Sequence, residues 1–267
     1  MKMFYYKTDN KTGKFNHLQF GLSLVEVLIV ISCILFLIAF IPLFLRPARV
    51  GSRMGALCPS RIKWLMIGIF TYADEHNYRP PFLTNSNNLN EISKDTSRLL
   101  LRNMGIDVNS AQFKENDIVY SSFFYCPANV QQKRNITKLW NFSKNIRIAG
   151  YFFLIDTKTG RPKIQGTDSQ LKQWVTRLDM PKQSEKEMIT DIIISDQINF
   201  KPPQYPNGNF EKIQSTILGR SGFESTNHLI NDAKPAGGNI GFIDGHVEWR
   251  PFNEMEKRYG DYPVCWW

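Results

Sequence analysis

The feature that most constrains this chain is a long apolar run close to its N-terminus. Residues 27–45 form a run of 19 residues in which Ser32 is the only polar side chain. As a helix this run would extend about 28 Å at roughly 1.5 Å per residue, which matches the hydrocarbon core of a bilayer. Glu26 stands directly before the run, where a carboxylate is costly without a specific partner. The pattern predicts a transmembrane helix over 22–45 and a function for Glu26.

The residues around this run indicate that it is kept in the mature protein. The segment before it is basic, as in a secretory signal peptide. However, the run is longer than a signal core of about 7 to 15 residues, and Leu45-Arg46-Pro47 after it is a poor cleavage site. The sequence therefore predicts an anchor that is not removed.

Three residues at the head of the run have an informative spacing. Gly21 ends a basic leader over 1–21, Leu22 follows it, and Glu26 is the fifth residue after the glycine. This arrangement resembles the N-terminus of type IV prepilins and type II secretion pseudopilins. The resemblance implies that a prepilin peptidase cuts between Gly21 and Leu22 and that the new Leu22 amine is N-methylated. It also implies that Glu26 pairs with this amine in a neighbouring subunit, which would set the register of assembly.

The same resemblance implies a cellular location. It predicts a single-pass inner-membrane protein with a cytoplasmic N-terminus and an exterior, periplasmic globular domain. The expected partners are the prepilin peptidase, other pilin or pseudopilin subunits in a homo- or hetero-filament, and the inner membrane.

A second signature lies near the C-terminus. Residues 239–243 and 246–250 are predicted strands, and Asp244-Gly245 between them favours the positive φ angles of a type I′ hairpin turn. This segment resembles the C-terminal prepilin processing-associated domain, which is named for a histidine, nine residues and then Asp-Gly. The corresponding histidine is His228, which is separated from Asp244 by 15 residues.

The remaining sequence mixes helical and strand patterns. Residues 48–76 and 92–104 are predicted helices, whereas 117–126, 146–156 and 188–195 are predicted strands. Together with the resemblance, this predicts a pilin-like α+β fold in which a long N-terminal transmembrane helix packs on an antiparallel β-sheet domain.

This interpretation also gives a domain organisation. The predicted parts are a prepilin leader (1–21), a transmembrane helix and filament spine (22–45), the outer part of the N-terminal helix (46–80) and an exterior globular domain (81–267).

The four cysteines lie far apart in the sequence. Cys33 falls in the apolar run and is interpreted as a small apolar filler. Cys58 and Cys126 each precede a proline, and an oxidising exterior would permit a disulfide between them. The connectivity stays open from sequence alone, and no C-x-x-C spacing indicates a zinc site.

The charge of the chain gives little indication of a specific partner. The formal net charge is +9, which is compatible with a nucleic acid or an anionic surface. No run of lysine and arginine interleaved with aromatic residues follows the apolar segment, so a generic basic surface is predicted and no nucleic-acid partner is expected.

Several acids and histidines have the residue types that chemistry requires. His228, His246, Asp196 and Asp244 could serve acid–base work or metal binding. Asp196 and Asp244 form a candidate calcium site, and no other cofactor is expected. The sequence contains no recognised serine or cysteine nucleophile motif and no H-E-x-x-H, so the chain is not expected to be an enzyme.

The predicted function is therefore structural. We expect a pseudopilin-like or pilin-like subunit of a type II secretion or type IV pilus-related system, assembled by helix bundling. The alternative is a membrane-anchored exterior domain, enzymatic or binding carbohydrate, for which a pocket joining His228 and Asp196 would be evidence. An adhesin or DNA receptor would instead require a clustered basic patch.

Overall fold

The structure is a computed structural model of the 267-residue chain. It describes residues 24–44, 50–84, 86, 88–114, 118–156, 174–196, 209–211, 213–214, 223–230, 234–259 and 263–267. The chain divides into two compact units, Met1–Ala48 and Arg49–Trp267, and each is treated by itself.

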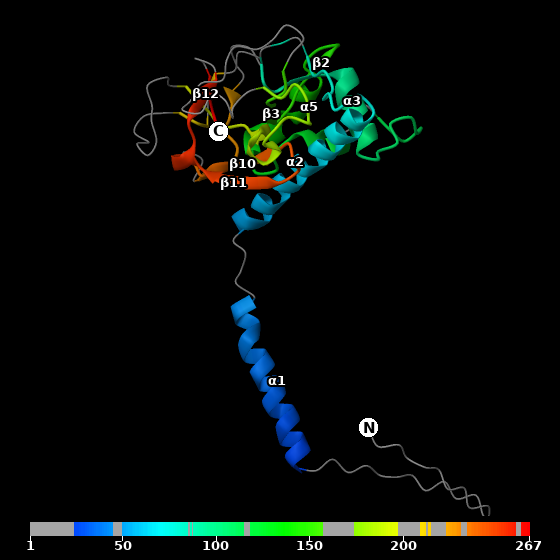
Figure 1. The fold of residues 1–267 in the computed structure, drawn as a ribbon. Coiled ribbons are helices and arrows are strands. Elements are labelled where there is room, and N and C mark those ends of the chain that lie inside the picture. The colour runs from blue at the N-terminus through cyan, green and yellow to red at the C-terminus, as the bar shows by residue number, and fades with distance from the viewer. Residues whose placement is uncertain are drawn as a thin grey trace, which may run out of the picture. The chain divides into compact units, whose positions relative to one another are not determined.

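The first unit contains helix α1, Leu24–Phe44 (Figure 1). Across the described residues, none of the helices has both the length and the apolar character that crossing a membrane requires. The predicted transmembrane helix over 22–45 is therefore wrong, and so is the inner-membrane location inferred from it.

The second unit begins with helix α2, Val50–Asp74, which confirms the helix predicted over 48–76. Pro59 lies inside it without ending it. The buried side chains recur every three or four residues, as expected for one face of a helix: Cys58, Ile62, Leu65, Met66, Ile69 and Ala73.

The buried face of α2 packs on an antiparallel four-stranded sheet with the order β11-β10-β4-β3 (Figure 1). Gly241 in β10 permits a close approach, because a Cβ there would lie 2.5 Å from Met66 Sδ and 2.8 Å from Ile62 Cγ2. The strands are β3 (Tyr151–Phe153), β4 (Glu187–Asp191), β10 (Gly237–Phe242) and β11 (Val247–Pro251). The α+β class with antiparallel sheets is thus confirmed.

The predicted C-terminal hairpin is present as β10 and β11, but its turn differs from the prediction. The Gly245 N–H donates to the Phe242 carbonyl at 3.0 Å, and the Phe242 N–H donates to the His246 carbonyl at 3.0 Å. Gly245 has φ +96°, whereas Asp244 is not among the described residues with positive φ. A longer turn with one left-handed glycine therefore replaces the type I′ turn, and the Asp244 carboxylate accepts the His246 N–H at 3.1 Å.

The remaining strands form smaller antiparallel sheets. One has the order β12-β13-β5, and the others are the pairs β1-β2, β6-β7 and β8-β9. Their bounds are β1 Glu91–Ser93, β2 Ile146–Ile148, β5 Ile194–Ser195, β6 Ile213–Gln214, β7 Phe223–Glu224, β8 Leu229–Ile230, β9 Lys234–Pro235, β12 Lys257–Tyr259 and β13 Val264–Trp266.

The remaining helices are short. Their bounds are α3 Lys94–Asn103, α4 Ile118–Ser121, α5 Val130–Trp140 and the 3₁₀ turns η1 Ser122–Phe124, η2 Gln183–Glu185 and η3 Phe252–Glu254.

The strand predicted over 117–126 is wrong, because α4 and η1 occupy the described part of this segment. Its aromatic residues pack around Trp140 of α5 instead of forming a ladder. The rings of Phe124 and Tyr125 lie 4.9 and 6.4 Å from the Trp140 ring, centroid to centroid. Tertiary packing therefore overrides the strand propensity of these aromatics.

Candidate functional site

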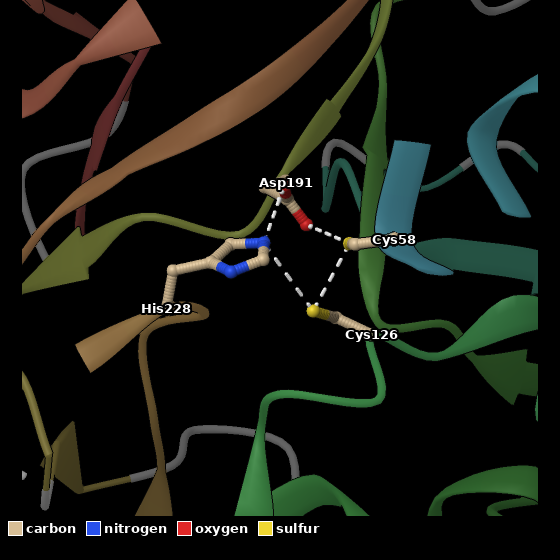
Figure 2. Close-up of side chains that lie close together, drawn as sticks. All are labelled: Cys58, Cys126, Asp191 and His228. Carbon is tan, nitrogen blue, oxygen red and sulfur yellow. Dashed lines mark hydrogen bonds and ion pairs between the residues drawn. The ribbon is translucent and has the colours of Figure 1, made fainter. Parts of the chain in front are cut away.

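Four chemically reactive side chains from distant parts of the sequence converge in the second unit (Figure 2). They are Cys58 on α2, Cys126 after η1, Asp191 at the end of β4 and His228 before β8. All four side chains are buried, and one potential ligand atom from each lies within 4.8 Å of all the others. We call this set the Cys-Cys-Asp-His cluster.

Short contacts connect the cluster. Cys58 Sγ lies 3.0 Å from Cys126 Sγ and 3.0 Å from Asp191 Oδ1. His228 Nε2 lies 2.9 Å from Asp191 Oδ2 and 3.5 Å from Cys126 Sγ. Tyr151 adds its hydroxyl 3.4 Å from Cys58 Sγ. Two sulfurs, one nitrogen and the carboxylate oxygens therefore point toward a common centre (Figure 2).

The Asp191 carboxylate is oriented by two asparagines. Asn239 donates to Oδ2 through its backbone N–H at 2.8 Å and through Nδ2 at 2.7 Å. Asn227 Nδ2 donates to Oδ1 at 2.8 Å and also to the Gly150 carbonyl at 3.1 Å. These bonds supply the hydrogen-bond donors that a buried carboxylate requires.

The segment that carries Cys126 is fixed by close backbone packing. The Gly150 N–H donates to the Phe124 carbonyl at 2.7 Å. A Cβ on Gly150 would lie 2.5 Å from Gln132 Oε1 and 2.9 Å from Tyr125 Cα, so a larger residue does not fit here. Glycine at this position brings the Cys126 segment against the sheet.

His228 adopts an unfavourable backbone conformation. Its φ is +54°, in the left-handed region that costs a residue with a side chain about 1 to 2 kcal/mol. The neighbouring Asn227 N–H donates to the Ile192 carbonyl at 2.7 Å, and the His228 carbonyl accepts the Ala236 N–H at 3.0 Å. The fold thus holds the imidazole over Asp191 despite this cost, and such strain is concentrated at functional sites.

Burial and pairing set the protonation of the cluster. Burial raises the pKa of the Cys58 and Cys126 thiols. Burial alone would raise the pKa of Asp191, but the charge of His228 and the hydrogen bonds lower it below its usual value. Burial alone would lower the pKa of His228, but the Asp191 carboxylate raises it to about 10. In the absence of another ion the cluster therefore contains two thiols beside an imidazolium–carboxylate pair.

This geometry does not suit nucleophilic catalysis. A Cys-His-Asp triad uses one imidazole nitrogen for the nucleophile and the other for the acid, whereas Nε2 of His228 meets both Cys126 and Asp191. The raised thiol pKa values also disfavour the thiolate that attacks substrates. Convergence of four donors on one point is instead the arrangement of a metal site.

The structure brings Cys58 and Cys126 together, as the sequence predicted. Both are free cysteines in the structure, so the disulfide between them stays a prediction. Gly21 and Leu22, the predicted cleavage and methylation positions, lie outside the described residues. Glu26 belongs to α1, although its side chain is outside the described part.

The other predicted site residues have local partners. Asp196 Oδ1 accepts the Asn209 N–H at 2.8 Å, and Asp244 Oδ1 lies 2.6 Å from His246 Nδ1. Neither acid belongs to a group of three or more metal-ligating side chains among the described residues. His228 contacts Asp191 and not Asp244. The calcium site at Asp196 and Asp244 stays a prediction.

Sequence reasoning missed Asp191 and the joining of His228 with the two cysteines. A signal for Asp191 was available, since the acid stands inside the apolar run Met188–Ser195. A carboxylate in a buried strand requires partners of opposite charge or hydrogen-bond donors. The cysteines and the histidine have no spacing that indicates a shared site, because each comes from a different element.

A second candidate region is the surface of α1. Val27, Leu28, Ile29, Val30 and Ile31 are consecutive and between 41% and 58% exposed, and at 3.6 residues per turn they point to every side of the helix. The Ser32 hydroxyl bonds within the helix to the Leu28 carbonyl at 2.8 Å. A helix that is apolar on all sides is normally enclosed by other elements.

Helix α2 also carries an apolar stripe on its outer face. Leu57, Trp64 and Ile67 are 53%, 46% and 43% exposed. Their spacing of seven and three residues places them on one side of the helix, away from the face that packs on the sheet. We call Leu57, Trp64 and Ile67 the outer stripe.

Comparisons with protein-family models, with curated proteins and with solved structures find no match to this chain.

Proposed function

We propose that this chain is a pilin-like structural subunit that assembles with further copies of itself by bundling helix α1. The observation that carries this proposal is the apolar surface on every side of α1. Full burial of a large aliphatic side chain is favourable by about 1.5 to 3 kcal/mol. Neighbouring helices that enclose Val27–Ile31 would therefore stabilise the assembly.

A helix bundle fits this surface better than a groove on another protein. A groove covers one face of a helix, whereas residues 27–31 occupy all faces. Copies of the same helix supply a matching apolar surface, and head-to-tail contacts between identical subunits that do not close into a ring generate helical filaments. The outer stripe of α2 is a further exposed apolar surface, on the second unit, that could contact neighbouring subunits.

Glu26 would give the bundle its register. It is the only charged residue of α1, and an unpaired carboxylate inside an apolar bundle is strongly unfavourable. The resemblance to prepilins supplies a partner, the amine of Leu22 on a neighbouring subunit after cleavage at Gly21. A subunit displaced along the bundle would leave Glu26 without that amine.

The direct test is coexpression of the full chain with a prepilin peptidase, followed by intact-mass and N-terminal analysis. We expect a mature chain that begins with methylated Leu22. A chain that stays uncut, or is cut beyond residue 45, would contradict the proposal.

A matched pair of variants tests the role of Glu26. Glu26→Ala should still be cut after Gly21 but should be incorporated poorly into filaments, because its neighbour's amine loses its partner. Glu75→Ala removes an exposed acid of the second unit and should assemble normally. Equal assembly of both variants would show that Glu26 does not set the register.

A further inference from the structure

The Cys-Cys-Asp-His cluster has the donor set of a metal site. The sequence motifs do not predict a metal site there, and the proposed assembly does not require one. Its residues are separated by 68, 65 and 37 positions along the chain, so the fold alone brings them together. All four are buried. Two thiols, an imidazole and a carboxylate rarely share a buried space unless they bind something in common.

The distances are close to those of tetrahedral coordination. Zinc binds sulfur at about 2.3 Å, nitrogen at about 2.0 to 2.1 Å and oxygen at about 2.0 to 2.2 Å, which separates neighbouring ligand atoms by roughly 3.2 to 3.8 Å in a tetrahedron. The four short contacts in the cluster run from 2.9 to 3.5 Å. Three of them are shorter than the tetrahedral separation, so these ligand atoms would move apart when the ion binds. No pair of its ligand atoms is more than 4.8 Å apart, so small side-chain movements would complete the site.

A disulfide between Cys58 and Cys126 explains the arrangement of the four side chains less well than a metal site does. It requires the two sulfurs about 2.05 Å apart, whereas Cys58 Sγ and Cys126 Sγ are 3.0 Å apart. It would also leave unexplained why Asp191 and His228 converge on the same two sulfurs.

The donor types select the ion. Thiolate and imidazole ligands favour zinc, whereas calcium takes six to eight oxygen ligands. The four protein donors leave no open position for a substrate, which is the pattern of structural zinc sites.

We propose that Cys58, Cys126, Asp191 and His228 bind one zinc ion, which ties helix α2 to strand β4 and to the segments that carry Cys126 and His228. On binding, both thiols and the imidazolium release their protons, because zinc is coordinated by thiolates and by neutral imidazole. The site is independent of assembly through α1.

Surrounding residues are placed to support such a site. Asn239 and Asn227 hold the Asp191 carboxylate, as outer partners of metal ligands do. Two thiolates and one carboxylate exceed the charge of a divalent ion by one. Arg61 lies close enough to lower the pKa of Cys126 against the effect of burial, and its Nη1 donates to the Tyr125 carbonyl at 2.5 Å. The guanidinium would offset the excess negative charge.

The experiment uses the full chain, purified under reducing conditions and freed of metal with a chelator. Titration with Co²⁺ should give a thiolate-to-cobalt charge-transfer band and the intense visible bands of a tetrahedral site, saturating at one ion per chain. Zn²⁺ should displace the cobalt and abolish these bands. Absence of the charge-transfer band in the reduced chain would overturn the proposal, and so would cobalt uptake without sulfur ligation.

Variants separate ligands from neighbours. Cys126→Ser and His228→Gln should lose the tetrahedral spectrum, and retention of the full wild-type spectrum by either would overturn the assigned ligand set. Cys265→Ser, a buried cysteine outside the cluster, and Tyr151→Phe, which removes only the hydroxyl beside Cys58, should retain it. The ligand set would also be contradicted if both control variants lost the spectrum while both ligand variants kept it.

One further variant gives a graded readout. Asn239→Ala removes an outer hydrogen bond to Asp191 and should weaken zinc binding roughly 10- to 100-fold, as outer-partner substitutions typically do. Unchanged affinity would contradict the supporting role of the Asn239 side chain at the zinc site. Cleavage after Gly21 and incorporation into filaments should stay at the wild-type level in all these variants, so failure of the zinc site and failure of the assembly proposal are distinguishable.

Discussion

Helices α1 and α2 are consecutive in the sequence, yet their apolar side chains differ in burial. In α2 the apolar residues alternate with polar ones at helical spacing, and Ile62, Leu65 and Ile69 are fully buried against the second unit. In α1 nearly every residue is apolar, and Val27–Ile31 are all at least 41% exposed. The amphipathic helix packs within its own unit, whereas the proposed function gives the uniformly apolar helix its partners in other copies of the chain.

The difference predicts that α2 contributes to the stability of the second unit and that α1 contributes to assembly. Substitutions on the buried face of α2 should lower the free energy of unfolding of the second unit. Substitutions in α1 should leave that quantity unchanged and impair association. All six tryptophans lie in the second unit, so tryptophan fluorescence during denaturation reports on that unit alone.

The largest effect is expected in the core beneath α2. Leu65→Ala removes a fully buried side chain and should lower the free energy of unfolding by about 2 to 5 kcal/mol, measured by urea denaturation. The matched control is Leu28→Ala in α1, where the side chain is 55% exposed. Its effect on the same transition should stay within about 0.5 kcal/mol. Equal losses in both variants would break the comparison.

A smaller effect is expected where α2 approaches the sheet most closely. Gly241→Ala would place a Cβ against Met66 and Ile62 and should destabilise the second unit by about 1 to 3 kcal/mol through overpacking. Because Met66 Sδ is the nearest atom, Met66→Ala combined with Gly241→Ala should cost less than the sum of the two single changes. Strict additivity in this double-mutant cycle would mean that the contact between residue 241 and Met66 does not cause the loss of stability.

The smallest effect on stability is expected on the outer stripe of α2. Leu57→Gln replaces a side chain that is 53% exposed with one of similar helix propensity, so the unfolding free energy should change by no more than about 0.5 kcal/mol. The same variant should reduce filament yield if the outer stripe contacts neighbouring subunits. Unaltered filament yield would restrict the assembly surface to α1.

Local sequence patterns predicted the parts of the fold that depend on local chemistry. Helical spacing predicted α2, and Asp244-Gly245 predicted the β10–β11 hairpin. The transmembrane helix predicted over 22–45 was wrong, because no helix of the described residues is both long enough and apolar enough to cross a membrane. The strand over 117–126 was wrong because Phe124 and Tyr125 pack around Trp140, a contact that propensity does not contain.

The candidate site was only partly within reach of the sequence. A disulfide between Cys58 and Cys126 was one pairing that the sequence left open, and the structure places their sulfurs 3.0 Å apart as free cysteines. Asp191 and His228 could not be joined to them, because that requires the register of β4 against β10 and the left-handed turn at His228. Long-range topology, and not local pattern, determines which reactive residues meet.

The proposed assembly requires α1 to pack against α1 of other copies, and Cys33 permits a direct measurement of this contact. Cys33 is exposed on α1, whereas Cys58, Cys126 and Cys265 are buried, so a bismaleimide added to the folded full chain should react through Cys33. We expect covalent dimers that disappear in Cys33→Ser and that fall sharply when Leu28→Asp and Ile31→Asp are combined, since charges oppose apolar bundling. Monomers alone in the wild type, or cross-linking unaffected by the two aspartates, would contradict assembly through α1.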